Sequence, residues 1–181
     1  MTFNIPVSVK PYVKRFLENN YGNPVDFRKH PREFEMFKRM LKKPNRRWDY
    51  HYKEKSGNKY DTIEVIITEV DFYRYGWTLS PTDVVSFGKY FEKNAKYLMR
   101  TVVALYVNFG TPIDKAIAIF QEKFKMEEEF WAFESIKKDF YRIRIIENMD
   151  ISSIAYENMI NILSINMRGN GILTESFVKM I

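Results

Sequence analysis

Two stretches near the start of the chain carry apolar residues at helical spacing. Over residues 11–21 and 30–43 an apolar side chain recurs every three or four positions, which places one apolar stripe on one side of a helix. Gly22 follows the first stretch and Pro44 follows the second, and both residue types are typical of helix ends. The pattern therefore predicts two short amphipathic helices.

Alternating positions follow and predict strands. Over 47–53 aromatic residues occupy every second position, and over 61–67 aliphatic residues do the same, as expected for extended chains with one covered face. The Ser-Gly-Asn sequence at 56–58 lies between the two runs and is typical of the short loop of a β-hairpin. Residues 6–9 are also expected to be extended.

From residue 79 onward the pattern is helical throughout. The sequence Leu-Ser-Pro-Thr-Asp at 79–83 supplies a hydroxyl N-cap, a proline in the first turn and an acid, which are features of a helix start. Apolar residues recur at helical spacing over 84–109, and Gly110 follows. We expect one helix of about 28 residues, roughly 40 Å long. A helix of this length commonly serves as a scaffold or a subunit contact.

Further helices are expected after the long one. The sequence Thr-Pro-Ile-Asp at 111–114 repeats the start signal and predicts a helix to residue 123. The three glutamates at 127–129 are expected to form the acidic first turn of the next helix, which continues over 130–144. The tail predicts a helix over about 152–166 and a short last helix after the Gly-Asn-Gly turn at 169–171.

Together these elements predict an α+β, mostly α fold. A small, basic helix/β-hairpin unit occupies residues 1–76, a helical part with the long helix and a helix-turn-helix-like element occupies 77–149, and a helical tail occupies 150–181. A chain of 181 residues is long enough to bury a substantial hydrophobic core.

Composition excludes several kinds of chemistry. The chain contains no cysteine and only two histidines, which rules out disulfides, cysteine-based zinc sites and thiol nucleophiles. No metal or other cofactor is expected. The sequence has no run of 18 apolar residues and no export signal, so we expect a cytoplasmic protein without membrane partners.

Positive charge is concentrated in the first third of the chain. Residues 1–60 carry 15 Lys and Arg against 6 Asp and Glu, whereas residues 61–181 carry 14 against 17. A cationic segment of this size attracts phosphate polymers, although a solvated basic face is the alternative. The candidate phosphate contacts are Lys38, Arg39, Lys42, Lys43, Arg46 and Arg47.

Aromatic residues are interleaved with these cations. If Trp48, Tyr50 and Tyr52 are exposed, their rings offer stacking surfaces for unpaired bases. If they are buried, they form the core face of the sheet, which is the interpretation that we favour because large aromatic residues are mostly buried.

The segment 130–144, FWAFESIKKDFYRIR, separates apolar from basic residues. At about 100° per residue, Phe133, Ile136 and Phe140 fall on one side of the predicted helix. The other side carries Lys137, Lys138, Tyr141 and Arg142. A helix of this kind can pack on its apolar side and present its cations to a DNA major groove.

The region that contains this helix has a family resemblance. The sequences Gly-Thr-Pro at 110–112, Ala-Ile at 116–117, Met-Glu at 126–127, Ser-Ile-Lys-Lys at 135–138 and Phe-Tyr-Arg at 140–142, with Phe120 between them, carry it. They resemble the helix-turn-helix end of uncharacterised phage and mobile-element proteins related loosely to phage transcription activators. The resemblance implies a dimerising N-terminal part and a DNA-reading helix with contacts from Ser135, Lys137, Lys138, Tyr141 and Arg142.

The sequence thus predicts a non-enzymatic protein that binds duplex DNA as a homodimer or higher oligomer, in the regulation or maintenance of a phage or mobile element. The alternative is a structural or assembly protein, such as a virion component, whose long helix and apolar tail make protein contacts. A further alternative is a magnesium-dependent nuclease that uses Asp61 and Glu64.

Overall fold

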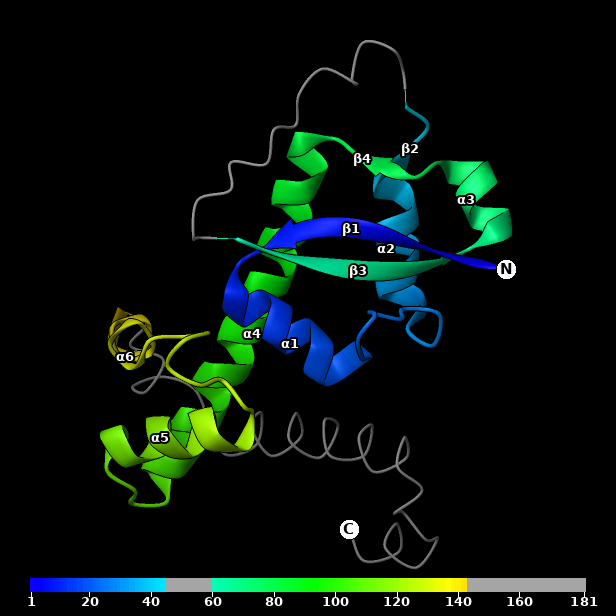
Figure 1. The fold of residues 1–181 in the computed structure, drawn as a ribbon. Coiled ribbons are helices and arrows are strands. Elements are labelled where there is room, and N and C mark those ends of the chain that lie inside the picture. The colour runs from blue at the N-terminus through cyan, green and yellow to red at the C-terminus, as the bar shows by residue number, and fades with distance from the viewer. Residues whose placement is uncertain (45–59, 143–181) are drawn as a thin grey trace, which may run out of the picture.

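The computed structural model describes residues 1–44 and 60–142 and confirms the predicted fold class, α+β and mostly α. Two pairs of strands are interspersed with helices in the first part of the chain, and in the described residues after Leu79 only helices follow (Figure 1). The described elements are β1 (Thr2–Val9), α1 (Pro11–Tyr21), α2 (Pro31–Met40), β2 (Leu41–Lys42), β3 (Asp61–Thr68), α3 (Glu69–Tyr75), β4 (Thr78–Leu79), α4 (Pro81–Asn108), α5 (Ile113–Lys123) and α6 (Phe133–Arg142).

Strands β1 and β3 form an antiparallel ribbon that crosses in front of α2 and α4 in the view of Figure 1. Every second residue of each strand points inward, so that Val7, Ile63 and Val65 are buried. The strand over 61–67 is confirmed, but the partner that the structure gives it is β1, which also extends further than the predicted 6–9. The first strand of the predicted hairpin, over 47–53, lies outside the described residues.

The outer edge of β1 is protected by a proline. On the far side of β3, the backbone of Val25 donates to the carbonyl of Glu64 and accepts from the N–H of Ile66, both at 2.8 Å. These two residues therefore turn their backbone groups away from β1, and their partners Asn4 and Pro6 must turn theirs to the outer edge. Because Pro6 has no N–H, it removes one donor from this edge and discourages further strand pairing.

Side chains connect α2 and β2 to the first half of α4. Lys42 Nζ in β2 lies 2.8 Å from Asp83 Oδ2 near the start of α4. One turn further along α4, the rings of Phe37 and Phe87 are 5.7 Å apart and both side chains are fully buried.

The predicted long helix is confirmed as α4, and its start signals act as expected. Ser80 is the N-cap, and its buried hydroxyl accepts from the N–H of Asp83 at 3.3 Å. The same hydroxyl also contacts the Asp83 carboxylate and lies 2.9 Å from Thr82 Oγ1. The buried Ser80 hydroxyl therefore has three polar partners, which are the N–H and the carboxylate of Asp83 and the hydroxyl of Thr82.

A glycine allows the chain before β4 to approach the backbone of β2 closely. Gly76 has φ +106°, and a Cβ there would lie 2.1 Å from the carbonyl carbon of Lys42. Only a residue without a side chain fits this approach. The Trp77 N–H then donates to the Lys42 carbonyl at 3.1 Å, which places the residues after α3 directly against β2.

The helix expected from residue 127 begins later than predicted. The predicted helix over 113–123 is confirmed as α5, whereas the acidic start at 127–129 is wrong because α6 begins only at Phe133. Trp131 turns into the core, where its ring stacks on Tyr12 at 4.4 Å, and this interrupts the helical path. The acids still serve the helix start, since the Glu128 carboxylate accepts from the Phe133 N–H at 2.8 Å.

Buried side chains on both sides of the predicted boundary at residue 76 belong to one hydrophobic cluster, and α4 contributes to it along most of its length. The predicted helical tail over 150–181 lies outside the described residues. In the described part of the chain, no helix combines the length and apolarity that crossing a membrane requires.

Candidate nucleic-acid interface

Lys38, a predicted phosphate contact, is paired with carboxylates of the protein itself. Its ammonium lies 2.5 Å from Glu35 and 4.0 Å from Asp71, over the rings of Phe34 and Tyr75. Only 12% of the side chain is exposed. Lys38 therefore links α2 to α3, and its charge is neutralised locally.

The other predicted cations of this region differ in availability. Lys42 is half exposed, but its ammonium is paired with Asp83. Arg39 and Lys43 are exposed, and no carboxylate contacts them among the described residues. Arg46 and Arg47 lie outside the described residues. The structure thus leaves two of the four described cations unneutralised.

Helix α6 has the two-sided character that its sequence predicts. Ile136 and Phe140 are buried, while Lys138, Tyr141 and Arg142 are exposed. Ser135 is also exposed, in the first turn of the helix. The described part of the chain gives neither Lys138 nor Arg142 a carboxylate partner.

Lys137 differs from the other cations of α6. Its ammonium lies 2.7 Å from the Asp114 carboxylate on α5, and this contact raises the pKa of Lys137. The ammonium also stands over the ring of Phe133 at 5.8 Å. The ion pair of Lys137 therefore connects α6 to α5, and its charge is partly neutralised by Asp114.

The connection between α5 and α6 is longer than that of a strict helix-turn-helix. Residues 124–132 separate the two helices, whereas the motif uses a turn of about three or four residues. The chain folds back at Lys125, which has φ +52°, and Met126 is buried. The basic side of α6 is present, but the tight turn that normally presents such a helix is replaced by a wider loop.

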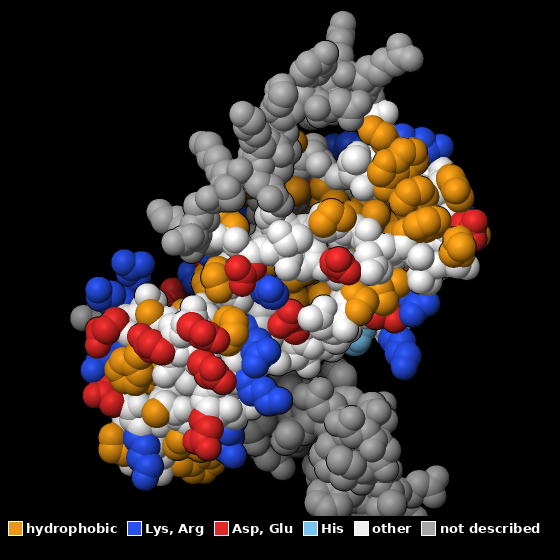
Figure 2. Space-filling view, in the orientation of Figure 1, with side chains coloured by type: hydrophobic (Ala, Val, Ile, Leu, Met, Phe, Trp, Pro, Cys, Tyr) orange, Lys and Arg blue, Asp and Glu red, His pale blue; other side chains and the backbone are white. Residues whose placement is uncertain are grey.

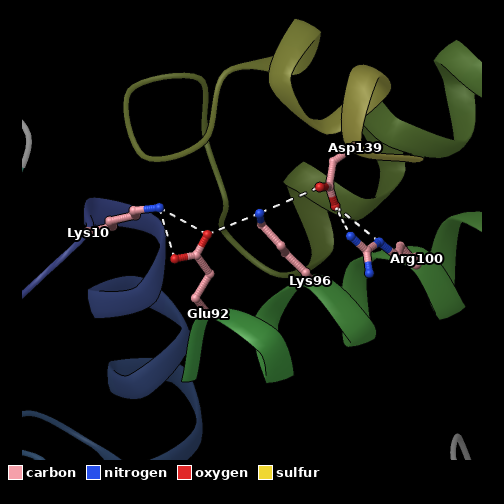
Figure 3. A network of polar contacts seen from close by, with 5 residues as sticks. All are labelled: Lys10, Glu92, Lys96, Arg100 and Asp139. Atoms are coloured by element: carbon pink, nitrogen blue, oxygen red, sulfur yellow. Dashed lines mark hydrogen bonds and ion pairs between the residues drawn. The ribbon is translucent and has the colours of Figure 1, made fainter. Parts of the chain in front are cut away.

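A network of ion pairs fixes α6 to the rest of the molecule (Figure 3). Glu92 on α4 accepts from Lys10 at 2.9 Å, at the junction of β1 and α1, and lies 3.0 Å from Lys96. Lys96 also lies 3.5 Å from Asp139 on α6, and Arg100 donates to the same carboxylate at 2.7 and 3.1 Å. Three parts of the chain that are distant in sequence therefore meet on α4.

Burial alone would raise the pKa of the Glu92 carboxyl. Hydrogen bonds from Lys10, Tyr12 and Lys96 outweigh burial, and they lower this pKa to about 2. The opposite applies to Tyr12, whose pKa is raised by burial and by the neighbouring Glu92. Glu92 is therefore held as a carboxylate throughout the neutral pH range.

The structure reveals two further cations that were not among the candidates from the sequence. Lys89 and Lys93 are exposed on α4, and no carboxylate contacts them among the described residues. They precede Lys96 and Arg100 on one side of the helix, at spacings of four, three and four residues. The spacing of these four cations within the predicted long helix is the sequence signal that could have identified the row.

The two carboxylates of the nuclease alternative do not converge. Asp61 and Glu64 are three residues apart on β3, so their side chains leave opposite faces of the strand. Asp61 lies 3.9 Å from Lys14, and Glu64 accepts from Asn4 at 2.8 Å. Within residues 1–44 and 60–142, no cluster of three metal-ligating side chains occurs.

No protein-family model matches the sequence, and neither a curated protein nor a solved structure gives a significant match to it.

Proposed function

We propose that the protein binds nucleic acid, with duplex DNA as the expected form, through exposed cations on and next to helices α2 and α4. The residues that we call the basic face are Lys29, Arg32, Arg39, Lys43, Lys89 and Lys93. The observation that carries the proposal is that all six side chains are exposed and that five of them have no carboxylate partner in the described chain. Lys29 is the exception, since it acts on the Asp26 carboxylate, which is already paired with Arg28. Unpaired cations of this kind bind phosphates and release the counterions of DNA.

Side-chain contacts connect α2 and the residues after it to the start of α4. Lys42 in β2 pairs with Asp83, and Phe37 on α2 packs against Phe87. Exposed cations on two helices can hold phosphates at more than one point of a duplex. This geometry favours positioning contacts, which give affinity without sequence information.

Helix α6 supplies a second, smaller set of contacts. Lys138, Tyr141 and Arg142 are exposed on its last two turns. Its start is acidic, with Glu134 in the first turn and three glutamates at 127–129 before it. Because these carboxylates repel phosphates, we propose that the C-terminal half of α6 approaches the DNA. This differs from a typical DNA-reading helix, which contacts the bases with its N-terminal residues.

The salt dependence of binding tests the basic face. Binding of the full chain to a labelled duplex of random sequence is measured by fluorescence anisotropy over a series of NaCl concentrations, for wild type and for the variant K89Q/K93Q. The slope of log K against log salt should become shallower by about 2 in the variant, roughly one unit for each lysine that no longer neutralises a phosphate.

The variant K115Q/K123Q is the matched control. Lys115 and Lys123 are also exposed on a helix, α5, without carboxylate partners in the described chain, so both variants remove the same net charge. The control should keep the wild-type slope, whereas K138Q/R142Q should weaken binding through α6. If wild type does not bind the duplex at low salt, nucleic-acid binding is wrong and the assembly alternative is favoured. If the two lysine variants behave alike, the basic face is not the binding surface.

Light scattering on the same samples tests the expected homodimer. A mass of two chains or more is expected for the free protein. A monomer would remove the predicted oligomer while leaving the test of the basic face intact.

A further inference from the structure

Aromatic rings are stacked at the surface where α3 meets the start of β1 and the turn before β4. The ring of Phe72 stacks on Phe3 with the centroids 4.2 Å apart, and on Trp77 with the centroids 4.9 Å apart and the planes at 9°. Tyr73 packs with its edge against Phe72 at 5.4 Å. Trp77 therefore stands at one end of a row of stacked rings.

The outer members of this aromatic group are open to solvent. Tyr73 is 59% exposed and Trp77 is 38% exposed, and the neighbouring Val70 is 73% exposed. Figure 2 shows hydrophobic side chains gathered over α3 and the adjacent end of the ribbon, with Lys and Arg at the rim of this patch. Large exposed rings that are grouped in this way are typical of a binding surface.

Two unneutralised cations flank the rings. Lys43 is exposed without a carboxylate partner in the described chain, and its backbone nitrogen lies beside Gly76, the residue before Trp77. Arg74 is exposed next to Tyr73 on α3 and stands over the ring of Tyr75 at 5.4 Å. The surface therefore combines flat apolar rings with positive charge.

The acids of the same region are already occupied. Glu69 lies 3.6 Å from the ammonium group of the N-terminus. Asp71 accepts from the Thr68 hydroxyl at 2.6 Å and lies 4.0 Å from Lys38. The local field around the rings is consequently set by Lys43 and Arg74, which suits a polyanion better than an apolar protein surface.

We propose that Tyr73 and Trp77 form a stacking platform for unpaired nucleobases, with the adjoining phosphates on Lys43 and Arg74. Every base has a flat face, so such a platform binds single strands with little dependence on sequence. Lys43 belongs to this platform and also to the basic face, which joins the two surfaces. The inference rests on the proposed nucleic-acid binding and narrows the ligand to duplex DNA that continues into a single strand.

A comparison of two DNA ligands tests the platform. Affinities of the full chain are measured for a blunt duplex and for the same duplex with a single-stranded tail. Wild type should bind the tailed duplex about ten-fold more tightly, as expected for one or two stacked bases. In Y73A/W77A this preference should disappear, while affinity for the blunt duplex should stay within about two-fold of wild type.

Two further variants keep the test interpretable. Because Trp77 stacks on Phe72, its loss can disturb the fold, and Y73A alone should still reduce the preference by about half on a logarithmic scale. The control F109A removes a 79% exposed ring at the end of α4 and should keep the full preference.

The outcomes separate this inference from the proposed function. If wild type binds blunt and tailed duplexes equally, the platform is wrong and the basic face stands. If wild type binds neither ligand, the nucleic-acid proposal itself fails. If Y73A changes the oligomer mass in light scattering but not the preference for the tail, the surface is a protein contact and the platform is overturned.

Discussion

Replacing Glu92 by glutamine should destabilise the fold in a pH-dependent way. The Glu92 carboxylate accepts from Lys10, Tyr12 and Lys96, and its side chain is only 19% exposed. Its pKa falls from 4.5 to about 2 on folding, although burial alone would raise it. The native contacts therefore favour the ionised form strongly.

The size of the effect follows from this difference in pKa. A lowering of about 2.5 units corresponds to about 3 kcal/mol at 1.36 kcal/mol per unit, and residual solvent screening makes roughly 2–3 kcal/mol the expected value. Because the folded-state pKa is the lower one, the stabilisation is fully present above about pH 4.5. It is lost as the pH falls toward about 2.

Urea unfolding followed by far-UV circular dichroism measures the effect. At pH 7, E92Q should be about 2–3 kcal/mol less stable than wild type, and the difference should shrink as the pH falls from about 5 to about 2. The control E122Q alters an exposed carboxylate on α5 and should change stability by less than about 0.5 kcal/mol. The reasoning would be refuted if E92Q lost as little stability at pH 7 as the E122Q control. It would also be refuted if E92Q lost the same stability at pH 3 as at pH 7.

Two glycines and one helix cap give further predictions for the same unfolding assay. Gly76→Ala should cost more than about 3 kcal/mol, because its Cβ would lie 2.1 Å from a backbone carbon and its φ is +106°. Gly88→Ala should instead gain about 0.5–1 kcal/mol, since the site lies inside α4 with nothing within 4 Å of the new Cβ. Equal effects of the two substitutions would contradict this account. Ser80→Ala should cost about 1–2 kcal/mol by removing the buried N-cap of α4, and a loss below about 0.3 kcal/mol would show that the cap contributes little.

Local signals in the sequence predicted α1, α2, α4 and α5, but they missed α3 and placed the start of α6 too early. The cap at Ser80 and the start of α4 depend on residues within one turn of one another, so that neighbouring letters suffice. The same kind of signal marks α3, a helix that the hydrophobic pattern alone does not predict. The Thr68 hydroxyl accepts from the Asp71 N–H, and Gly76 follows the helix. This cap is the local signal for the helix that carries Tyr73.

Contacts between distant residues explain what the sequence did not predict. The alternation over 61–67 indicates a strand but carries no information about its partner. The partner is β1, which lies more than 50 residues earlier in the sequence. In the same way, a helical pattern cannot tell a neutralised cation from an available one. Lys38 and Lys137 meet Asp71 and Asp114 from other helices, whereas Lys89 has no such partner in the described chain.

The long helix carries one row of four cations, of which two are held in ion pairs and two are exposed. Lys96 and Arg100 are anchored to Glu92 and Asp139, while the two cations that precede them in the row stay exposed. Loss of the Glu92 carboxylate should therefore loosen the attachment of α6 without removing any cation of the basic face. Substitution of the exposed pair should lower DNA affinity without changing the unfolding free energy by more than about 0.5 kcal/mol. A variant pair with these opposite effects would show that the row serves two separable purposes, and a common effect would mean that binding depends on the position of α6.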